Sequence, residues 1–277
     1  MVFEFLVSPL TAEAKPARTF FLGFVYTVMA FFLALWVFKD HAGLISIFFI
    51  VMASLPLILG ATKIEEEKDV LLDDEKSIIK EHSRALTFFM FFFFGITVAY
   101  LLIYIALPSG VIANVFQEQT KTISAIRGDV SSISTLLKIF FNNVKVLTFC
   151  LLFSLFFGAG AIFVLAWNAS IIATAAGLFA RNNLSVVASQ TGLNIGHYFQ
   201  YVSIGLMRYI IHGVPEVLAY FVGGLAGGIL SFAIVRNDYR TKRFEKILTD
   251  VSDMVLLALM LLVLAAVLEV YVTPLIF

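Results

Sequence analysis

The chain has 277 residues, of which 61% are hydrophobic and 14% charged, and its formal net charge is zero. Soluble domains contain roughly 45–50% apolar and about 25% charged residues, so this composition excludes an ordinary water-soluble domain. The charge balance also gives no indication of a nucleic-acid partner. Because the apolar stretches are long and continuous rather than alternating, the predicted fold class is all-α: a polytopic transmembrane helical bundle in one integral membrane domain, residues 1–277.

The N-terminal part of the chain, residues 1–107, is predicted to cross the bilayer three times. The apolar runs cover residues 19–38, 43–61 and 87–107. The turn between the first two runs is so short that they must form an antiparallel hairpin. Residues 62–86 are the most polar part of the chain and carry two acidic triplets whose spacing fits no metal-binding loop, so we interpret them as a solvated helical extension.

A moderately polar stretch, residues 109–138, separates the third apolar run from the fourth. Apolar side chains such as Val115 and Ile123 could line one side of a helix that lies on the membrane surface. Asn142 and Asn143 then precede the fourth span, which is predicted to begin near residue 144. Asparagine at such a position typically caps the start of a helix.

The fourth apolar run continues past its predicted end at Trp167 as far as Ala180. A single helix of about 36 residues would measure roughly 54 Å, whereas the hydrocarbon core of a bilayer is about 30 Å thick. We therefore expect the chain to break at Asn168 and to form half-helix or re-entrant segments between residues 168 and 211. Two further spans bring the predicted total to about six: 214–235 and 254–276.

The distribution of Lys and Arg in short loops predicts the orientation. Loop 62–86 and the segment 236–246 each hold five basic residues, so the loops 62–86 and 236–253 are predicted to be cytoplasmic in a multi-pass protein of the cell membrane. An even number of crossings must then separate them, but only three predicted spans do. This mismatch independently indicates non-standard structure between residues 168 and 211. Discontinuous helices of that kind build many transport sites.

The strongest polar cluster within the apolar part of the chain consists of Arg208, His212 and Glu216. Their spacing of four residues places them on one face of a helix. Gly213 and Pro215 predict a kink or a helix start at this point, because proline lacks the N–H that an α-helix requires. A helix start would make Glu216 a structural cap that interacts favourably with the helix dipole. The alternative is a functional site for a proton, a ligand or a partner.

Small residues suggest where helices pack closely. The fifth span contains two overlapping G-x-x-x-G patterns, and small residues of the fourth span could face them. Packing within the chain is one interpretation, and homodimerisation is the other. The residues concerned are Gly158, Gly160, Gly223, Gly224, Gly227 and Gly228.

Motifs for catalysis or for metal binding are not recognisable in the sequence. It contains no H-E-x-x-H, no G-x-S-x-G and no Cys or His cluster with metal-ligand spacing. We therefore predict no enzymatic activity, no catalytic residue, no cofactor and no metal site.

Several of these features together resemble the stage II sporulation protein M family over roughly residues 135–235. They are the Phe141-x-Asn143 start of the fourth span, the small residues at 158–160, Trp167-Asn168 followed by small residues, and His212-Gly213-x-x-Glu216 before a glycine-rich span. The resemblance implies a multi-span protein without catalytic activity of its own. In spore-forming bacteria the family member anchors a peptidoglycan-remodelling complex in the membrane, and relatives also occur in organisms that form no spores.

Two functions follow as expectations. The first is a scaffold or anchor for a cell-envelope or membrane-remodelling complex, which would contact protein partners through residues 109–138, 181–200 or 62–86. The second is a transporter, channel or lipid-moving protein that uses the broken segments and the polar site at Arg208, His212 and Glu216. Because most spans lack facing polar residues, the sequence favours the scaffold. The bilayer is the other expected partner.

Overall fold

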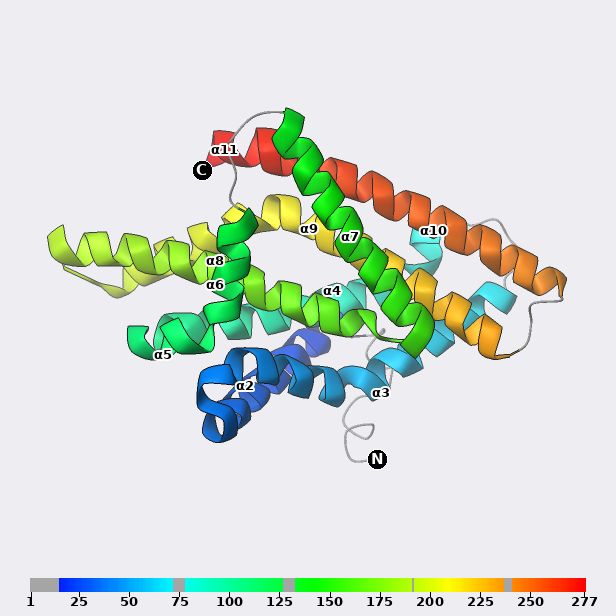
Figure 1. Cartoon of the computed structure of the whole chain (residues 1–277), viewed down its shortest axis with the longest axis horizontal. Helices are drawn as coiled ribbons and strands as arrows, with labels where there is room; N and C mark the ends of the chain where they lie inside the picture. Colours follow the sequence, from blue (N-terminus) through cyan, green and yellow to red (C-terminus); the bar gives the residue numbers. More distant parts are fainter. Residues whose placement is uncertain (1–14, 72–77, 127–132, 191, 237–240) are drawn as a thin grey trace.

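The computed structural model describes residues 15–71, 78–126, 133–190, 192–236 and 241–277. Within that part of the chain every regular element is a helix and no strand occurs, so the all-α prediction is confirmed. Most of the long helices run roughly along the longest axis of the molecule, whereas the helix Ile133–Phe157, labelled α7, crosses that direction steeply (Figure 1). The centres of the two basic segments, residues 72–77 and 237–240, lie outside the described residues.

The N-terminal helices form the predicted hairpin. Helix α2 (Pro16–Phe38) and helix α3 (Ala42–Leu71) meet at a short 3₁₀ turn, η1 (Lys39–His41). Lys39 adopts a positive φ of 43°, which reverses the chain direction within a few residues. Helix α4 (Ile78–Ala106) then packs against α2, and Pro108 directly follows its end.

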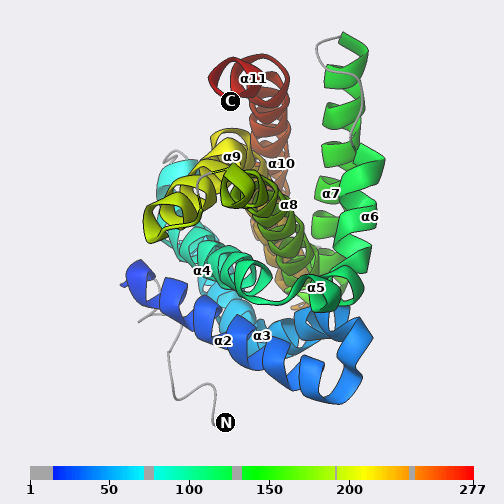
Figure 2. The same cartoon turned by 90° about the vertical axis from the view of Figure 1, so that its left-hand side faces the viewer.

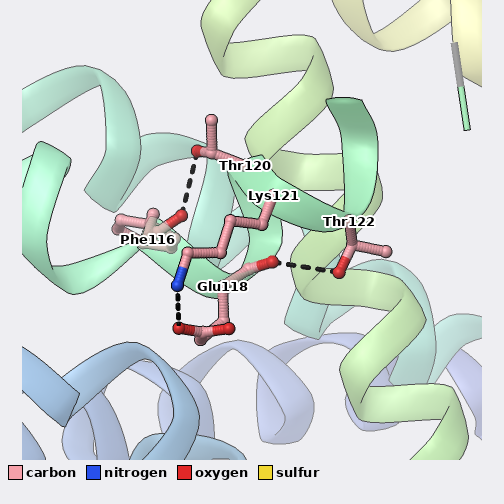
Figure 3. Close-up of polar contacts among 5 residues, drawn as sticks. All are labelled: Phe116, Glu118, Thr120, Lys121 and Thr122. Carbon is pink, nitrogen blue, oxygen red and sulfur yellow. Dashed lines mark hydrogen bonds and ion pairs between the residues drawn. The ribbon is translucent and has the colours of Figure 1, made fainter. Parts of the chain in front are cut away.

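Two short helices cover one end of the bundle, in the stretch where the apolar pattern predicted one helix on the membrane surface. They are α5 (Ser109–Val115) and α6 (Gln117–Ile126). Ile123 of α6 is buried, whereas the opposite side of α6 carries exposed polar groups, including an ion pair of 2.9 Å between Lys121 and Glu118 (Figure 3). The α5–α6 segment therefore lies with its apolar side on the bundle and its polar side outward.

The predicted break at Asn168 is wrong. Helix α7 (Ile133–Phe157) ends ten residues earlier, and helix α8 (Ala161–Gln190) passes through Asn168 without interruption. The chain turns at Gly158, whose φ of 73° is readily adopted by glycine but not by other residues. The over-long apolar run is therefore divided into two full-length helices, not into one span and a half-helix.

The predicted helix start near residues 211–215 is also wrong. Helix α9 runs continuously from Ile195 to Val235 with Pro215 inside it. Between residues 168 and 211 the described chain consists of α8, a short turn and α9, and none of these described residues forms a re-entrant segment. Its true start is capped by Asn194, whose side chain accepts a hydrogen bond of 3.0 Å from the backbone of His197. Gly213 does not disturb the helix.

The chain ends in a long helix with an irregular last turn. Helix α10 (Lys242–Val267) continues into a π-helical turn, η3 (Leu268–Val272), and a final short helix, α11 (Thr273–Ile276). The backbone N–H of Thr273 bonds to the carbonyl of Leu268, five residues earlier. Since Pro274 has no N–H to donate, the backbone hydrogen bonds of the helix change from four-residue to five-residue spacing just before it.

Six stretches of the described chain are long and apolar enough to cross a membrane. The first of them contains both α2 and α3, so the candidates for membrane-crossing helices are α2, α3, α4, α7, α8, α9 and α10. Each predicted span has a counterpart among these helices, and α8 is the additional one. The result is a polytopic helical membrane bundle, as predicted.

Candidate functional site

Helices α7 and α9 pack at backbone distance through two of the predicted glycines. A Cβ atom added at Gly223 would overlap the side chain of Leu147, and one added at Gly227 would overlap the carbonyl of Leu151. Successive turns of α7 thus meet successive turns of α9, so the two helices run in the same direction where they cross (Figure 1). The other two glycines of the motif face different neighbours: Gly224 faces Ala161 at the start of α8, and Gly228 faces Thr62 and the carbonyl of Gly158.

The glycine motif therefore lies inside the protomer. Gly160 is also close-packed, because a Cβ there would overlap the carbonyl of Phe153 in the preceding helix. All four glycines of the motif are buried, and each lies against another part of the same chain. The packing interpretation accounts for these positions without a second copy of the protein.

The polar cluster on α9 does not form a network of its own. Among the described residues, no hydrogen bond or ion pair joins Arg208, His212 and Glu216 to one another. The Arg208 guanidinium instead lies 5.6 Å from the ring centre of Phe179 on α8, a cation–π arrangement. Sharing one helix face therefore does not join the three side chains by hydrogen bonds or ion pairs.

His212 reaches the π-helical turn at the end of the chain. Its Nδ1 lies 3.2 Å from the hydroxyl of Thr273, which itself donates to the carbonyl of Leu268 at 3.0 Å. Because the single hydroxyl proton is directed at Leu268, Thr273 accepts from His212, and this network assigns the imidazole proton to Nδ1. His212 is buried and thereby ties α9 to the C-terminal segment.

Glu216 lies one turn further along the same face. The hydroxyl of the fully buried Tyr220 donates to its carboxyl at 2.8 Å. Glu269, in the π-helical turn, lies four residues before Thr273, and Glu216 lies four residues after His212. Because α9 and the C-terminal helix run in opposite directions (Figure 1), the His212–Thr273 contact places Glu216 and Glu269 on facing turns.

Glu216 is in the middle of a helix, so the predicted cap is wrong. Helix α9 begins about six turns before it, beyond the reach of the positive end of the helix dipole. A cavity of about 20 Å³ is lined by Phe93 and Thr97 of α4 and by Gly213 and Val217 of α9, which flank Glu216. Thr97 is the midpoint of the apolar part of α4. Glu216 is therefore level with the middle of that span.

The three asparagines that were predicted to cap or break helices are all inside helices. Asn142 and Asn143 follow the start of α7 at Ile133 by more than two turns. Asn168 donates to the carbonyl of Val164 at 2.9 Å, within α8. Asn143 is buried, and its Nδ2 has no hydrogen-bond partner within the described structure. A buried donor of this kind lowers stability unless a partner satisfies it.

A second buried polar pair was not predicted. Glu65, near the end of α3, and His82, near the start of α4, are almost completely buried, and their Oε2 and Nδ1 atoms lie 2.6 Å apart. The acidic triplet at 65–67 was interpreted as a solvated face. Glu65 instead faces into the bundle, because α3 and α4 remain packed beyond their apolar runs.

Arg181 of α8, which the sequence placed in a polar loop, caps the end of α4. Its guanidinium donates to the carbonyls of Tyr104, Ile105 and Leu107 at 3.2, 3.3 and 2.8 Å and to the hydroxyl of Ser109 at 2.7 Å. The last carbonyls of a helix have no partner within it, and the planar fork of arginine satisfies several at once.

Replacing Arg181 with methionine, which keeps an apolar stem but has no donors, is expected to lower the free energy of unfolding by about 1.5–3 kcal/mol. The exposed Lys121, changed to methionine, is the matched control and should alter stability much less. The buried Cys150 is the only cysteine of the chain, so a thiol-reactive dye reports thermal unfolding in detergent. Equal melting curves for the two variants would contradict the capping role.

Metal-binding geometry is not found in the described part of the chain, where no group of three or more His, Cys, Asp or Glu could hold a metal ion. The site around Glu216 therefore offers hydrogen-bonding and electrostatic chemistry. Its groups are two carboxyls, one imidazole, a tyrosine and a threonine hydroxyl, and an unpaired amide.

Comparison with known proteins gives one match. The family model of stage II sporulation protein M matches residues 85–274, from the start of the apolar part of α4 to α11. No curated protein and no solved structure matches the chain. The matched region contains α4 to α10 and the polar groups around Glu216, and it extends well beyond residues 135–235, where the sequence motifs lie. The chain belongs to the stage II sporulation protein M family.

Proposed function

We propose that this protein is a membrane scaffold that anchors a cell-envelope or membrane-remodelling complex. The observation that carries the proposal is the continuity of α8 and α9. The transport alternative depended on broken helices between residues 168 and 211, and the described helices are unbroken there. A rigid bundle of full-length helices suits an anchor, whose task is to hold partners in place.

The cavities of the bundle also favour the scaffold. One cavity, between α3, α7, α8 and α9, and the cavity beside Gly213 each hold about 20 Å³, the room of about one water molecule. Neither is lined by a charged residue, and neither includes Arg208, His212 or Glu216. A transporter would be expected to connect its polar groups to a water-filled path.

The proposed orientation places both basic segments in the cytoplasm. Four long helices, α4, α7, α8 and α9, separate these segments, and an even number returns the chain to the same side. The sequence predicted only three spans between the two basic segments, an odd number that would put them on opposite sides; four helices put them on the same side. In this orientation α5, α6, the α8–α9 turn and the C-terminus are on the outer side.

Two surfaces on that outer side suit protein partners. Helix α8, with 30 residues, is about 45 Å long and exceeds the roughly 30 Å hydrocarbon core, so the α8–α9 end extends beyond it (Figure 1). Around this end Ile195 is 89% exposed and Phe199 78% exposed, and Val186, Leu193 and Tyr198 are also exposed. An apolar patch outside the bilayer indicates a contact surface. The polar face of α6 is the second surface.

Affinity purification from native membranes in mild detergent tests the scaffold. We expect specific proteins to accompany the wild type and to be reduced at least about tenfold by Ile195→Ser/Phe199→Ser, because aromatic and large apolar groups dominate contact energies. A Lys121→Ala variant on α6 keeps the patch intact and is the matched control. His212→Ala/Glu216→Ala is run beside them, and bound lipids are identified as well as proteins.

If wild-type protein brings down no specific protein, and if a small molecule or lipid follows only the intact His212–Glu216 pair, the scaffold is wrong. Flux assays in liposomes then test the transport alternative directly. Partners that accompany wild type and the His212→Ala/Glu216→Ala variant equally would support a scaffold whose contacts lie outside the polar site.

A further inference from the structure

Two carboxyl groups meet deep in the membrane part of the protein without a cation beside them. Within the described structure no Lys, Arg or His forms an ion pair with Glu216 or Glu269, and Arg208 is engaged with Phe179. A charged side chain at the centre of a span costs about 2.5–3.5 kcal/mol on insertion scales. Acidic groups placed there in pairs therefore require neutralisation from elsewhere.

An unpaired amide lies on a neighbouring helix. Leu147 of α7 packs on Gly223 of α9, and the two helices run in the same direction at this contact, so Asn143, one turn before Leu147, lies on the Tyr220 side of the contact. Asn143 is 5% exposed, shares the buried face of α7 with Leu147, and its Nδ2 donates to no group in the described structure. In the described structure, neither carboxyl forms an ion pair with a cation, and this amide donates to no acceptor.

The acidic pair remains reachable from the lipid side. Glu216 and Glu269 are only partly buried, whereas Tyr220 and His212 beside them are buried. Helices α7 and α10 are the least covered of the long helices, since only 22% and 28% of their most apolar segments are buried inside the protein. Figure 2 shows α7 at one edge of the molecule and α10 next to α9.

The depth of the two carboxyls in the membrane determines which kind of cationic group can reach them. Glu216 is level with Phe93 and Thr97, near the middle of α4, whereas the ammonium group of a lipid stays at the headgroup level. A side chain carried on another membrane helix can reach that depth, and its backbone polar groups are already paired. Lysine and arginine supply both positive charge and N–H donors to carboxylates.

We propose that Glu216 and Glu269 receive a lysine or arginine side chain from a transmembrane helix of a partner protein, which packs on the face formed by α7 and α10. This inference rests on the proposed scaffold function and specifies the partner by its chemistry: a membrane protein whose span contains a basic residue near its middle. Tyr220 holds Glu216 in position through its hydroxyl, and His212 holds α9 against the π-helical turn that carries Glu269.

A designed peptide tests the proposal without knowledge of the natural partner. Two Leu/Ala peptides of about 21 residues, one with a central lysine and one with glutamine there, are mixed with the full chain in phosphatidylcholine nanodiscs. Energy transfer between dyes on peptide and protein measures association. We expect the lysine peptide to bind at least about tenfold more tightly, and the difference to vanish in Glu216→Gln/Glu269→Gln.

Glu118→Gln, which changes an exposed acidic residue of α6, is the control and should leave the preference unchanged. Equal binding of the two peptides to the wild type overturns the proposal, and so does a lysine preference that survives Glu216→Gln/Glu269→Gln. Loss of the preference when phosphatidylethanolamine is added would assign the pair to a lipid ammonium group instead. Natural partners that still co-purify with Glu216→Gln/Glu269→Gln would overturn this inference but not the scaffold function.

Discussion

Replacing Glu65 with alanine is expected to lower the free energy of unfolding by about 3–5 kcal/mol, because it removes one partner of a buried polar pair. Its Oε2 lies 2.6 Å from Nδ1 of His82, and both side chains are almost inaccessible to solvent. The imidazole would lose its carboxylate in a place where water cannot replace it. Thermal unfolding followed through the thiol of Cys150 measures the change.

The control for this prediction is Glu118→Ala, which removes the partner of Lys121 in an exposed pair of similar distance, 2.9 Å. Exposed pairs contribute only about 0–1 kcal/mol, so this variant should melt close to the wild type. The double variant Glu65→Gln/His82→Gln, which replaces the pair with two neutral amides, should regain part of the loss. Similar melting of Glu65→Ala and Glu118→Ala would refute the structural role of the buried pair.

The second large effect is expected at Gly95, in the middle of α4. Gly95→Ala should destabilise the protein by about 3 kcal/mol, because overpacking of a close helix contact forces the backbone to move. An added Cβ would overlap the carbonyl oxygen of Phe20 and lie 2.9 Å from the backbone N of Phe24, both on α2. The obstacle is backbone, so no side-chain rotation can relieve it.

Gly110→Ala is the matched control, since no atom outside its local helix lies within 4 Å of an added Cβ there. Alanine is a better helix former than glycine, so this variant should be neutral or slightly stabilised. The Cys150 dye assay applies to both variants. If Gly95→Ala melts like Gly110→Ala, then α2 and α4 are not in backbone contact at this position.

The positions of most membrane helices could be predicted from the sequence, because a helix in the hydrocarbon core must be long and apolar, and both properties can be read from the sequence. Long apolar runs with few charges marked α2, α3, α4, α10 and the glycine-rich half of α9. The hairpin at Lys39–His41 followed from the shortness of the polar turn. The apolar pattern within residues 109–138 predicted an amphipathic helix on the membrane surface, and the structure has two short helices there whose apolar residues are buried against the protein.

The division of residues 144–211 could not be read in the same way. An apolar run shows that a segment lies in the membrane, but it does not show where one helix ends and the next begins. Asparagine and proline suggested ends at Asn168 and Pro215, yet both residues are accommodated inside helices. The real turn depends on the positive φ of Gly158, one of many glycines in the chain. Neighbouring helices satisfy or shield the irregular positions, as is common in membranes.

For the candidate site, too, the sequence indicated some features and the tertiary structure was needed for others. The sequence by itself determined that Arg208, His212 and Glu216 lie on one helical face at membrane depth, because a spacing of four residues and an apolar setting suffice for that. Only the tertiary structure decided their partners: Phe179, Thr273 and Tyr220.

The physical reason is that contacts between helices depend on register, and register is set by side-chain packing over the whole bundle. Glu269 faces the turn of Glu216 because α10 packs antiparallel on α9, where His212 contacts Thr273 next to Pro274. Asn143 lies on the Tyr220 side of the α7–α9 contact because glycines let α7 approach α9. The sequence thus determined which residues enter the membrane, and the packing of the helices decided which of them meet.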